Sequence, residues 1–162
     1  IIFSWEELSD LAEWDMAGAR GKLMDILSNY QGYKKNTVIL VFDAYKVEGN
    51  TGEVTRYHNI HVVYTKEAET ADQYIEKTVH EIGRKYRVTV ATSDALEQMI
   101  ILGQGAQRMS AQGLKEEIQA ANIEIRGSYL NKHSRSKNYL FDYLPEDLAE
   151  DMEEVRLGKK EL

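Results

Sequence analysis

Hydrophobic positions along the chain follow two patterns, one typical of amphipathic helices and one typical of buried strands. Residues 16–30 repeat apolar side chains every three or four positions, which predicts a helix with Arg20 outside its apolar stripe. Residues 37–42 (TVILVF) are a continuous apolar and β-branched run, as expected of a strand buried on both faces. The same patterns predict strands at 60–64 and 87–92, and helices at 4–13, 70–86, 95–102 and from 110 onward.

Local signals define where these elements begin and how they are arranged. Ser4 and Glu7 have the spacing of a capping box, and Thr70 can cap the helix that follows it. Glycines among charged residues predict a loop at 45–57. Alternating strands and helices favour an α/β three-layer fold with a mainly parallel central sheet. Because the pattern weakens after Gly127, we expect a domain at 1–126 and a C-terminal extension or tail at 127–162.

Composition narrows the classes of protein that fit this fold. The 162 residues are 43% hydrophobic, which suits one globular domain, and no apolar run approaches the roughly 18 residues of a membrane helix. The N-terminus lacks the pattern of a signal peptide, so we expect a cytoplasmic protein. The absence of cysteine leaves oxygen and imidazole as metal ligands. A net charge of −7 argues against a surface that coats nucleic acid generally, although local basic patches remain compatible with it.

Three aspartates lie where the predicted strands give way to helices. Asp43 directly follows the first strand, Asp94 follows the third, and Asp72 opens the helix after the second. Since the carboxyl ends of parallel strands share one edge of a sheet, we expect these carboxylates to converge. Converging carboxylates generally hold a divalent cation, and an all-oxygen set favours Mg²⁺ or Mn²⁺. The alternative is that each aspartate only caps a helix or turn, as aspartates commonly do.

Other charged residues are weaker candidates for the same chemistry. Glu97 and Glu69 are possible auxiliary acids near the site. The cations that we expect to contact RNA are Arg108, Lys115, Lys34 and Lys35, the last two beside tyrosines. An ordinary solvated surface explains each of these cations equally well.

The motifs resemble one known family. The sequences VFDA at 41–44, KEAETADQYIEK at 66–77, VATSD at 90–94 and ILGQGAQRMSA at 101–111 are similar to those of the bacterial NYN-domain (PIN-like) ribonucleases of the YacP and Rae1 type. The resemblance covers about residues 1–126. It implies a PIN-like fold and a metal-dependent endoribonuclease that associates with ribosomes and acts on mRNA, with catalytic and metal-binding roles for Asp43, Asp72 and Asp94.

The resemblance also sets two further expectations. The family's first motif, a strand ending in Asp-Gly-Tyr-Asn, would precede Ile1, so we expect this chain to lack that strand and to be impaired in packing and catalysis. Related domains occur at the carboxyl end of translation GTPases similar to tetracycline ribosomal-protection factors, and a fragment of such a protein would fit. The competing hypothesis is a noncatalytic RNA- or ribosome-binding module with a degenerate PIN-like fold. A receiver-like signalling domain fits less well, because the chain shows no phosphoacceptor arrangement with its partner lysine.

Overall fold

Helices and strands alternate along most of the chain, as the hydrophobic pattern predicts. The structure, a computed structural model, describes residues 1–44 and 52–135. Its elements in chain order are η1 (Ile2–Ser4), α1 (Glu6–Trp14), α2 (Met16–Lys34), β1 (Ile39–Phe42), β2 (Glu53–Tyr57), β3 (Ile60–Tyr64), α3 (Ala71–Ile82), β4 (Thr89–Thr92), α4 (Ala95–Gly103), β5 (Gln107–Ser110) and α5 (Ala111–Arg135). This order confirms the predicted α/β class.

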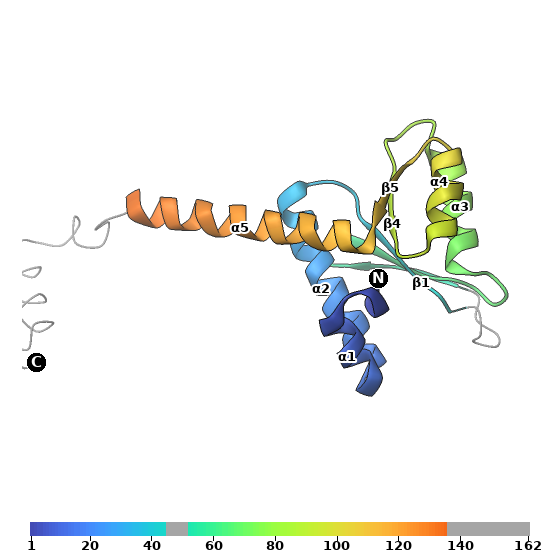
Figure 1. The fold of residues 1–162 in the computed structure, drawn as a ribbon, viewed down its shortest axis with the longest axis horizontal. Coiled ribbons are helices and arrows are strands. Elements are labelled where there is room, and N and C mark those ends of the chain that lie inside the picture. The colour runs from blue at the N-terminus through green and yellow to red at the C-terminus, as the bar shows by residue number, and fades with distance from the viewer. Residues whose placement is uncertain (45–51, 136–162) are drawn as a thin grey trace, which may run out of the picture. The chain divides into compact units, whose positions relative to one another are not determined.

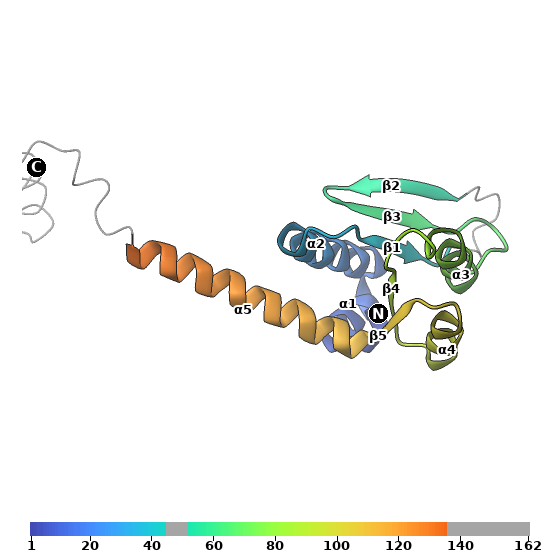
Figure 2. The same cartoon turned by 90° about the horizontal axis from the view of Figure 1, so that it is seen from above.

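The described strands form two small sheets instead of the single central sheet that we expected. One sheet has the order β1-β3-β2 and the other pairs β4 with β5. The pairs β1–β3 and β4–β5 are parallel, which confirms a mainly parallel arrangement, whereas β2 runs antiparallel to β3. Figure 2 shows β2, β3 and β1 side by side. In the parallel pair Phe42 lies opposite Tyr64, so β1 and β3 end at the same edge.

Helices cover the strands on two sides and enclose two apolar cores. Figure 1 shows α3 and α4 on one side of the strands, with α1, α2 and the first turns of α5 on the other. The larger core consists of Trp5, Leu8, Leu23, Leu27, Tyr30, Leu40, Phe42, Ile60, Val62, Ile118 and Ala121. The smaller core consists of Val79, Val90, Ile101 and Ala106. These layers explain why the β1 run is apolar, although Ile39 at its start is 44% exposed.

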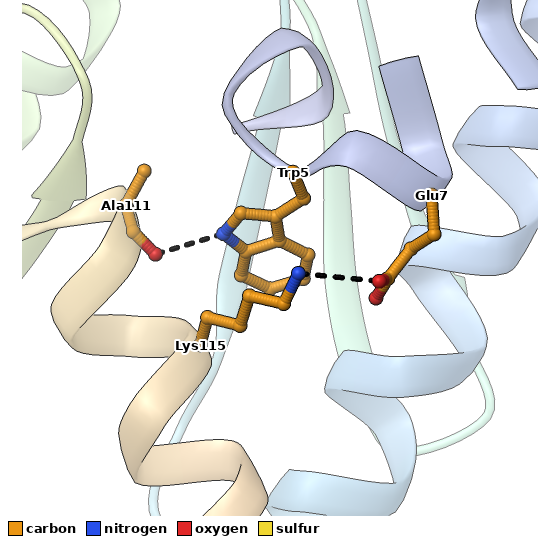
Figure 3. Close-up of polar contacts among 4 residues, drawn as sticks. All are labelled: Trp5, Glu7, Ala111 and Lys115. Carbon is orange, nitrogen blue, oxygen red and sulfur yellow. Dashed lines mark hydrogen bonds and ion pairs between the residues drawn. The ribbon is translucent and has the colours of Figure 1, made fainter. Parts of the chain in front are cut away.

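Trp5 joins the start of the chain to α5. Its side chain is only 1% exposed, and its Nε1–H donates a 2.8 Å hydrogen bond to the carbonyl oxygen of Ala111 (Figure 3). The expected capping box at Ser4 does not form, because Ser4 belongs to the preceding 3-10 turn and Trp5 is the N-cap of α1, without a side-chain cap. Helix α1 therefore begins after a buried tryptophan instead of a capping side chain.

Two strands differ from the expectations. The loop expected at 45–57 contains β2 at its end, while residues 45–51 lie outside the described part of the chain. β5 lies where we expected only a glycine break before the last helix. Both strands are mostly exposed and polar, so no apolar run marks them. They form because β3 and β4 supply backbone hydrogen bonds along their lengths.

The helix predicted after Thr70 is present but shorter than expected. The Thr70 hydroxyl accepts a hydrogen bond from the backbone N–H of Gln73, and the Gln73 side chain accepts one from Thr70 N–H, which completes a capping box. The helix ends at Ile82 before Gly83. Tyr86, the last residue of the predicted range 70–86, is therefore exposed beyond its end. Thr70 thereby fixes Asp72 in the first turn of α3.

The contacts of the chain divide it into two units, Ile1–Ile123 and Glu124–Leu162. In the second unit the structure describes the end of α5, where the Ser128 hydroxyl donates a 2.9 Å hydrogen bond to the carbonyl oxygen of Glu124. The helix continues through Gly127, where we expected the pattern to end, and the division at 126/127 stays a prediction. None of the helices in the described ranges is long and apolar enough to cross a membrane.

Candidate active site

Asp94 is positioned by the turn that joins β4 to α4. It is the N-cap of α4, and its Oδ1 accepts hydrogen bonds from the backbone N–H groups of Leu96 (2.7 Å) and Glu97 (3.2 Å). The Thr92 hydroxyl accepts a 3.1 Å hydrogen bond from Asp94 N–H and so fixes the turn. The capping role uses one carboxylate oxygen only. The other, Oδ2, has no hydrogen-bond partner among residues 1–44 and 52–135 and is available to a ligand.

A small cavity joins Asp94 to Asp72, although 22 positions separate them in the sequence. Its volume is about 60 Å³, enough for a cation with a few water molecules. Its lining combines acidic and apolar residues and consists of Asp72, Glu76, Asp94, Leu96, Glu97, Ile100 and Ile101. The two aspartates come from the first turn of α3 and the N-cap of α4, so two helix starts face the same space.

Glu97 is the most constrained acid of this cavity. Its side chain is 6% exposed, and its Oε1 is shielded from solvent without a hydrogen-bond partner among the described residues. Burial raises the pKa of Glu97; a hydrogen bond with Thr92 lowers it by less, and the negative charges of Asp72 and Asp94 raise it further. A buried carboxylate oxygen without a partner beside two other carboxylates is an arrangement that a cation stabilises.

The donor set fits a hard divalent cation that keeps much of its own hydration. Within the described ranges, no group of three or more His, Cys, Asp or Glu side chains is placed so that it could hold a metal ion. Mg²⁺ does not require one, since proteins usually hold it through one or two carboxylates, with water and substrate phosphate oxygens as the remaining ligands. Asp72 and Asp94 can supply those carboxylates, and Glu97 lines the cavity beside them.

The three predicted aspartates do not all reach this cavity. Asp43 is exposed directly after β1 and is not among the lining residues, because β1 and β4 belong to different sheets. Of the two auxiliary acids, Glu97 lines the cavity and Glu69 does not. The spacing of Asp94 and Glu97, one helical turn apart, already placed them on the same side of α4. The sequence showed no sign that Glu97 is buried.

The four cations expected to contact RNA differ in their surroundings. Lys115 Nζ lies 3.2 Å from Glu7 Oε2 (Figure 3), and Lys34 Nζ lies 3.2 Å from Glu117 Oε1. These two charges are partly neutralised within the chain. Arg108 is exposed on β5, directly before the last helix, and Lys35 is exposed just after α2. Their contact with RNA stays a prediction.

Comparisons with known proteins agree on one family. The YacP-like NYN domain family matches residues 1–157. The uncharacterised protein YacP of Bacillus subtilis (strain 168) is 42% identical over 126 residues, which are 77% of this chain and 74% of that protein. The crystal structure of a W164L mutant of Rae1 (YacP) from the same species aligns with a TM-score of 0.71 and 36% identity, over 83% of this chain and 79% of that one. A second crystal structure of Rae1 (YacP) from Bacillus subtilis aligns with a TM-score of 0.65 and 34% identity, over 97% of this chain and 90% of that one.

Proposed function

The chain belongs to the YacP-like NYN domain family, whose fold is nuclease-like, and from this membership and the acidic cavity we propose that it is a metal-dependent endoribonuclease. One observation carries the proposal. Asp72 and Asp94 line one cavity with Glu97, whose buried oxygen has no hydrogen-bond partner among the described residues. An all-oxygen site of this kind suits Mg²⁺ or Mn²⁺.

The residues of the cavity have distinct roles in this mechanism. A bound Mg²⁺ or Mn²⁺ ion supplies activation of water and neutralisation of charge on the attacked phosphate. Asp72 and Asp94 would hold the ion by their carboxylates, and the two hydrogen bonds that Asp94 accepts from α4 keep its carboxylate oriented. Glu97 is proposed as an auxiliary acid that lines the cavity beside these two ligands. Asp43, at the end of β1, is proposed as a further ligand or as a residue that orients the substrate.

A ribonuclease assay on the purified chain tests this proposal. With Mn²⁺ and a single-stranded RNA, we expect internal cleavage that a chelator abolishes. Asp72→Asn or Asp94→Asn removes a ligand charge and should slow cleavage by at least about a hundredfold, since even residues that only support metal ligands contribute 10–100-fold. Asp10→Asn, an exposed change on α1, is the matched control and should cleave like the parent. Equal cleavage by all four proteins would refute the mechanism.

The noncatalytic alternative predicts a different pair of results. An RNA- or ribosome-binding module would bind RNA without cutting it, and its binding would not depend on Mn²⁺. Isothermal titration with Mn²⁺ separates the two hypotheses directly. A nuclease should bind the ion through Asp72 and Asp94 and lose that binding in Asp72→Asn, whereas a pure adaptor should show no heat that depends on these residues.

We further propose that the substrate is mRNA undergoing translation in the cytoplasm. Support for this step is the resemblance of the family motifs, including VATSD at 90–94, to ribosome-associated ribonucleases. Sedimentation of the chain with purified ribosomes tests the association. Cleavage of one mRNA with and without active translation tests the substrate, and equal cleavage in both conditions would limit the proposal to free RNA.

A further inference from the structure

Arg20 on α2 is a half-buried cation with an unusual set of neighbours. Its guanidinium carbon lies 5.5 Å from the centroid of the Phe42 ring. Phe42 is 7% exposed and stacks on Tyr64, with ring centroids 5.4 Å apart. The ion pairs found among residues 1–44 and 52–135 are those of Lys34 and Lys115, and no hydrogen bond of Arg20 side-chain atoms occurs there. An aromatic ring thus takes the place of a carboxylate beside this charge.

This arrangement leaves the guanidinium able to take an external anion. Partial burial of a charge is unfavourable unless something compensates it, and a cation–π contact compensates only part of that loss. The nearest acids along α2 have other roles: Asp15 accepts the N–H of Gly18, and Asp25 accepts the Tyr57 hydroxyl. The five N–H donors of an arginine match the geometry of a phosphate, and the ring beneath holds their plane in place.

Arg20 also lies at the functionally relevant edge of the fold. Phe42 is the last residue of β1 and is paired in register with Tyr64, the last residue of β3. From that edge the chain continues to α3, which packs against β1 and carries Asp72 in its first turn. Asp43 follows Phe42 directly. Arg20 therefore lies beside the shared end of β1 and β3, the strands that precede Asp43 and Asp72 in the chain.

We propose that Arg20 binds a backbone phosphate of single-stranded RNA at the shared end of β1 and β3, with Tyr64 positioned to stack on a neighbouring base. The inference rests on the proposed function, because it names RNA as the ligand. Single-stranded RNA is recognised through phosphate contacts combined with aromatic or arginine stacking, and Arg20 and Tyr64 supply these groups together. On a chain of net charge −7, a single oriented guanidinium provides local attraction without a general basic surface.

Fluorescence anisotropy with a labelled single-stranded RNA tests this assignment. The measurements are made in chelator, so that binding is read without cleavage. Arg20→Gln should weaken binding by about tenfold or more, as expected for loss of a hydrogen bond to a charged group. It should also reduce the slope of log Kd against log salt by about 0.7, the value for one phosphate on a single strand. Arg20→Lys should be intermediate, since it keeps the charge but loses the planar donors.

Lys22→Gln is the matched control, because Lys22 is exposed two residues away on the same helix and the change removes the same charge. Equal weakening in Lys22→Gln and Arg20→Gln, or no binding of RNA by the parent, would overturn the proposal. Thermal melting shows whether each variant is folded. If Arg20→Gln unfolds, NMR of the parent protein replaces the binding comparison. A shift of the Arg20 Nε–H signal on addition of the RNA supports the contact, and an unchanged signal refutes it.

This result is separable from that of the nuclease proposal. If Arg20→Gln weakens binding but the parent never cleaves RNA, the phosphate contact stands and the catalytic proposal fails. If the parent cleaves RNA and Arg20→Gln binds and cleaves normally, the catalytic proposal stands and the role of Arg20 is refuted.

Discussion

Replacing Glu97 by glutamine should make the metal-free protein more stable at neutral and alkaline pH. Burial raises the pKa of Glu97 from its usual 4.5, and the charges of Asp72 and Asp94 add to the effect. A carboxyl group whose pKa is raised by folding stabilises the native state while it is protonated. This contribution to the unfolding free energy is complete below pH 4.5 and is lost as the pH rises through the folded-state pKa. Glutamine resembles the protonated acid and has no proton to lose, so Glu97→Gln should retain this contribution at high pH.

The size of the effect follows from two features of the cavity. Between pH 4.5 and the raised pKa, the parent should lose up to about 1.4 kcal/mol of unfolding free energy per pH unit relative to Glu97→Gln. An unsatisfied buried acceptor costs about 1–3 kcal/mol, which sets the scale of the difference at pH 8. For a chain of this size that corresponds to a Tm about 2–10 °C higher for Glu97→Gln. At pH 4 the two proteins should melt together.

Thermal unfolding in chelator from pH 4 to pH 8 measures this difference. Glu76→Gln is the matched control, because Glu76 lines the same cavity but is exposed, and its pH profile should follow that of the parent. Parallel profiles for Glu97→Gln and the parent would refute the idea that Glu97 carries an uncompensated charge. Addition of Mn²⁺ should then stabilise the parent more than Glu97→Gln, since the ion compensates the charge that the variant lacks.

Two further predictions concern the larger core. Trp5→Phe should lower the unfolding free energy by about 2–3 kcal/mol, because it removes buried volume and the 2.8 Å hydrogen bond to the carbonyl oxygen of Ala111. Urea unfolding measures this loss, and a loss below about 0.5 kcal/mol would contradict the role of Trp5. Burial and a 2.6 Å hydrogen bond to Glu117 raise the pKa of Tyr30 to about 12, and the same bond lowers the pKa of Glu117. Tyr30→Phe should therefore raise the pKa of Glu117 in a carboxyl NMR titration. It should also remove about 1 kcal/mol of stability that is present above pH 4.5 and lost as the pH falls, and an unchanged Glu117 titration would show that the bond is unimportant.

Elements whose physics is local were predictable from the sequence. The apolar stripe of α2 is buried at Ala19, Leu23, Leu27 and Tyr30, as its spacing requires. Thr70 caps α3 and Asp94 caps α4, because a capping side chain bonds to backbone groups two or three residues away. The expected proximity of Asp72 and Asp94 also followed from sequence, although the strands before α3 and α4 belong to different sheets.

Features that depend on distant partners were not predictable. β2 and β5 are short, polar and exposed, and they are strands only because β3 and β4 lie beside them. Arg20 was expected outside the apolar stripe of its helix, but Phe42 from β1 lies beneath its guanidinium. The cations Lys34 and Lys115 looked free in the sequence and are paired with acids from other helices.

The sequence by itself determined the succession of the helices α1–α5 with β1, β3 and β4, the caps that begin α3 and α4, and two of the acids that share the cavity. Only the tertiary structure decided that the described strands form two sheets, that Asp43 lies outside the cavity lining, and that Glu97 is buried with an unpartnered oxygen. The physical reason is the distance along the sequence over which each interaction acts. Periodicity and capping act within a few residues, whereas burial, strand pairing and ion pairs are set by residues that meet only after the chain has folded.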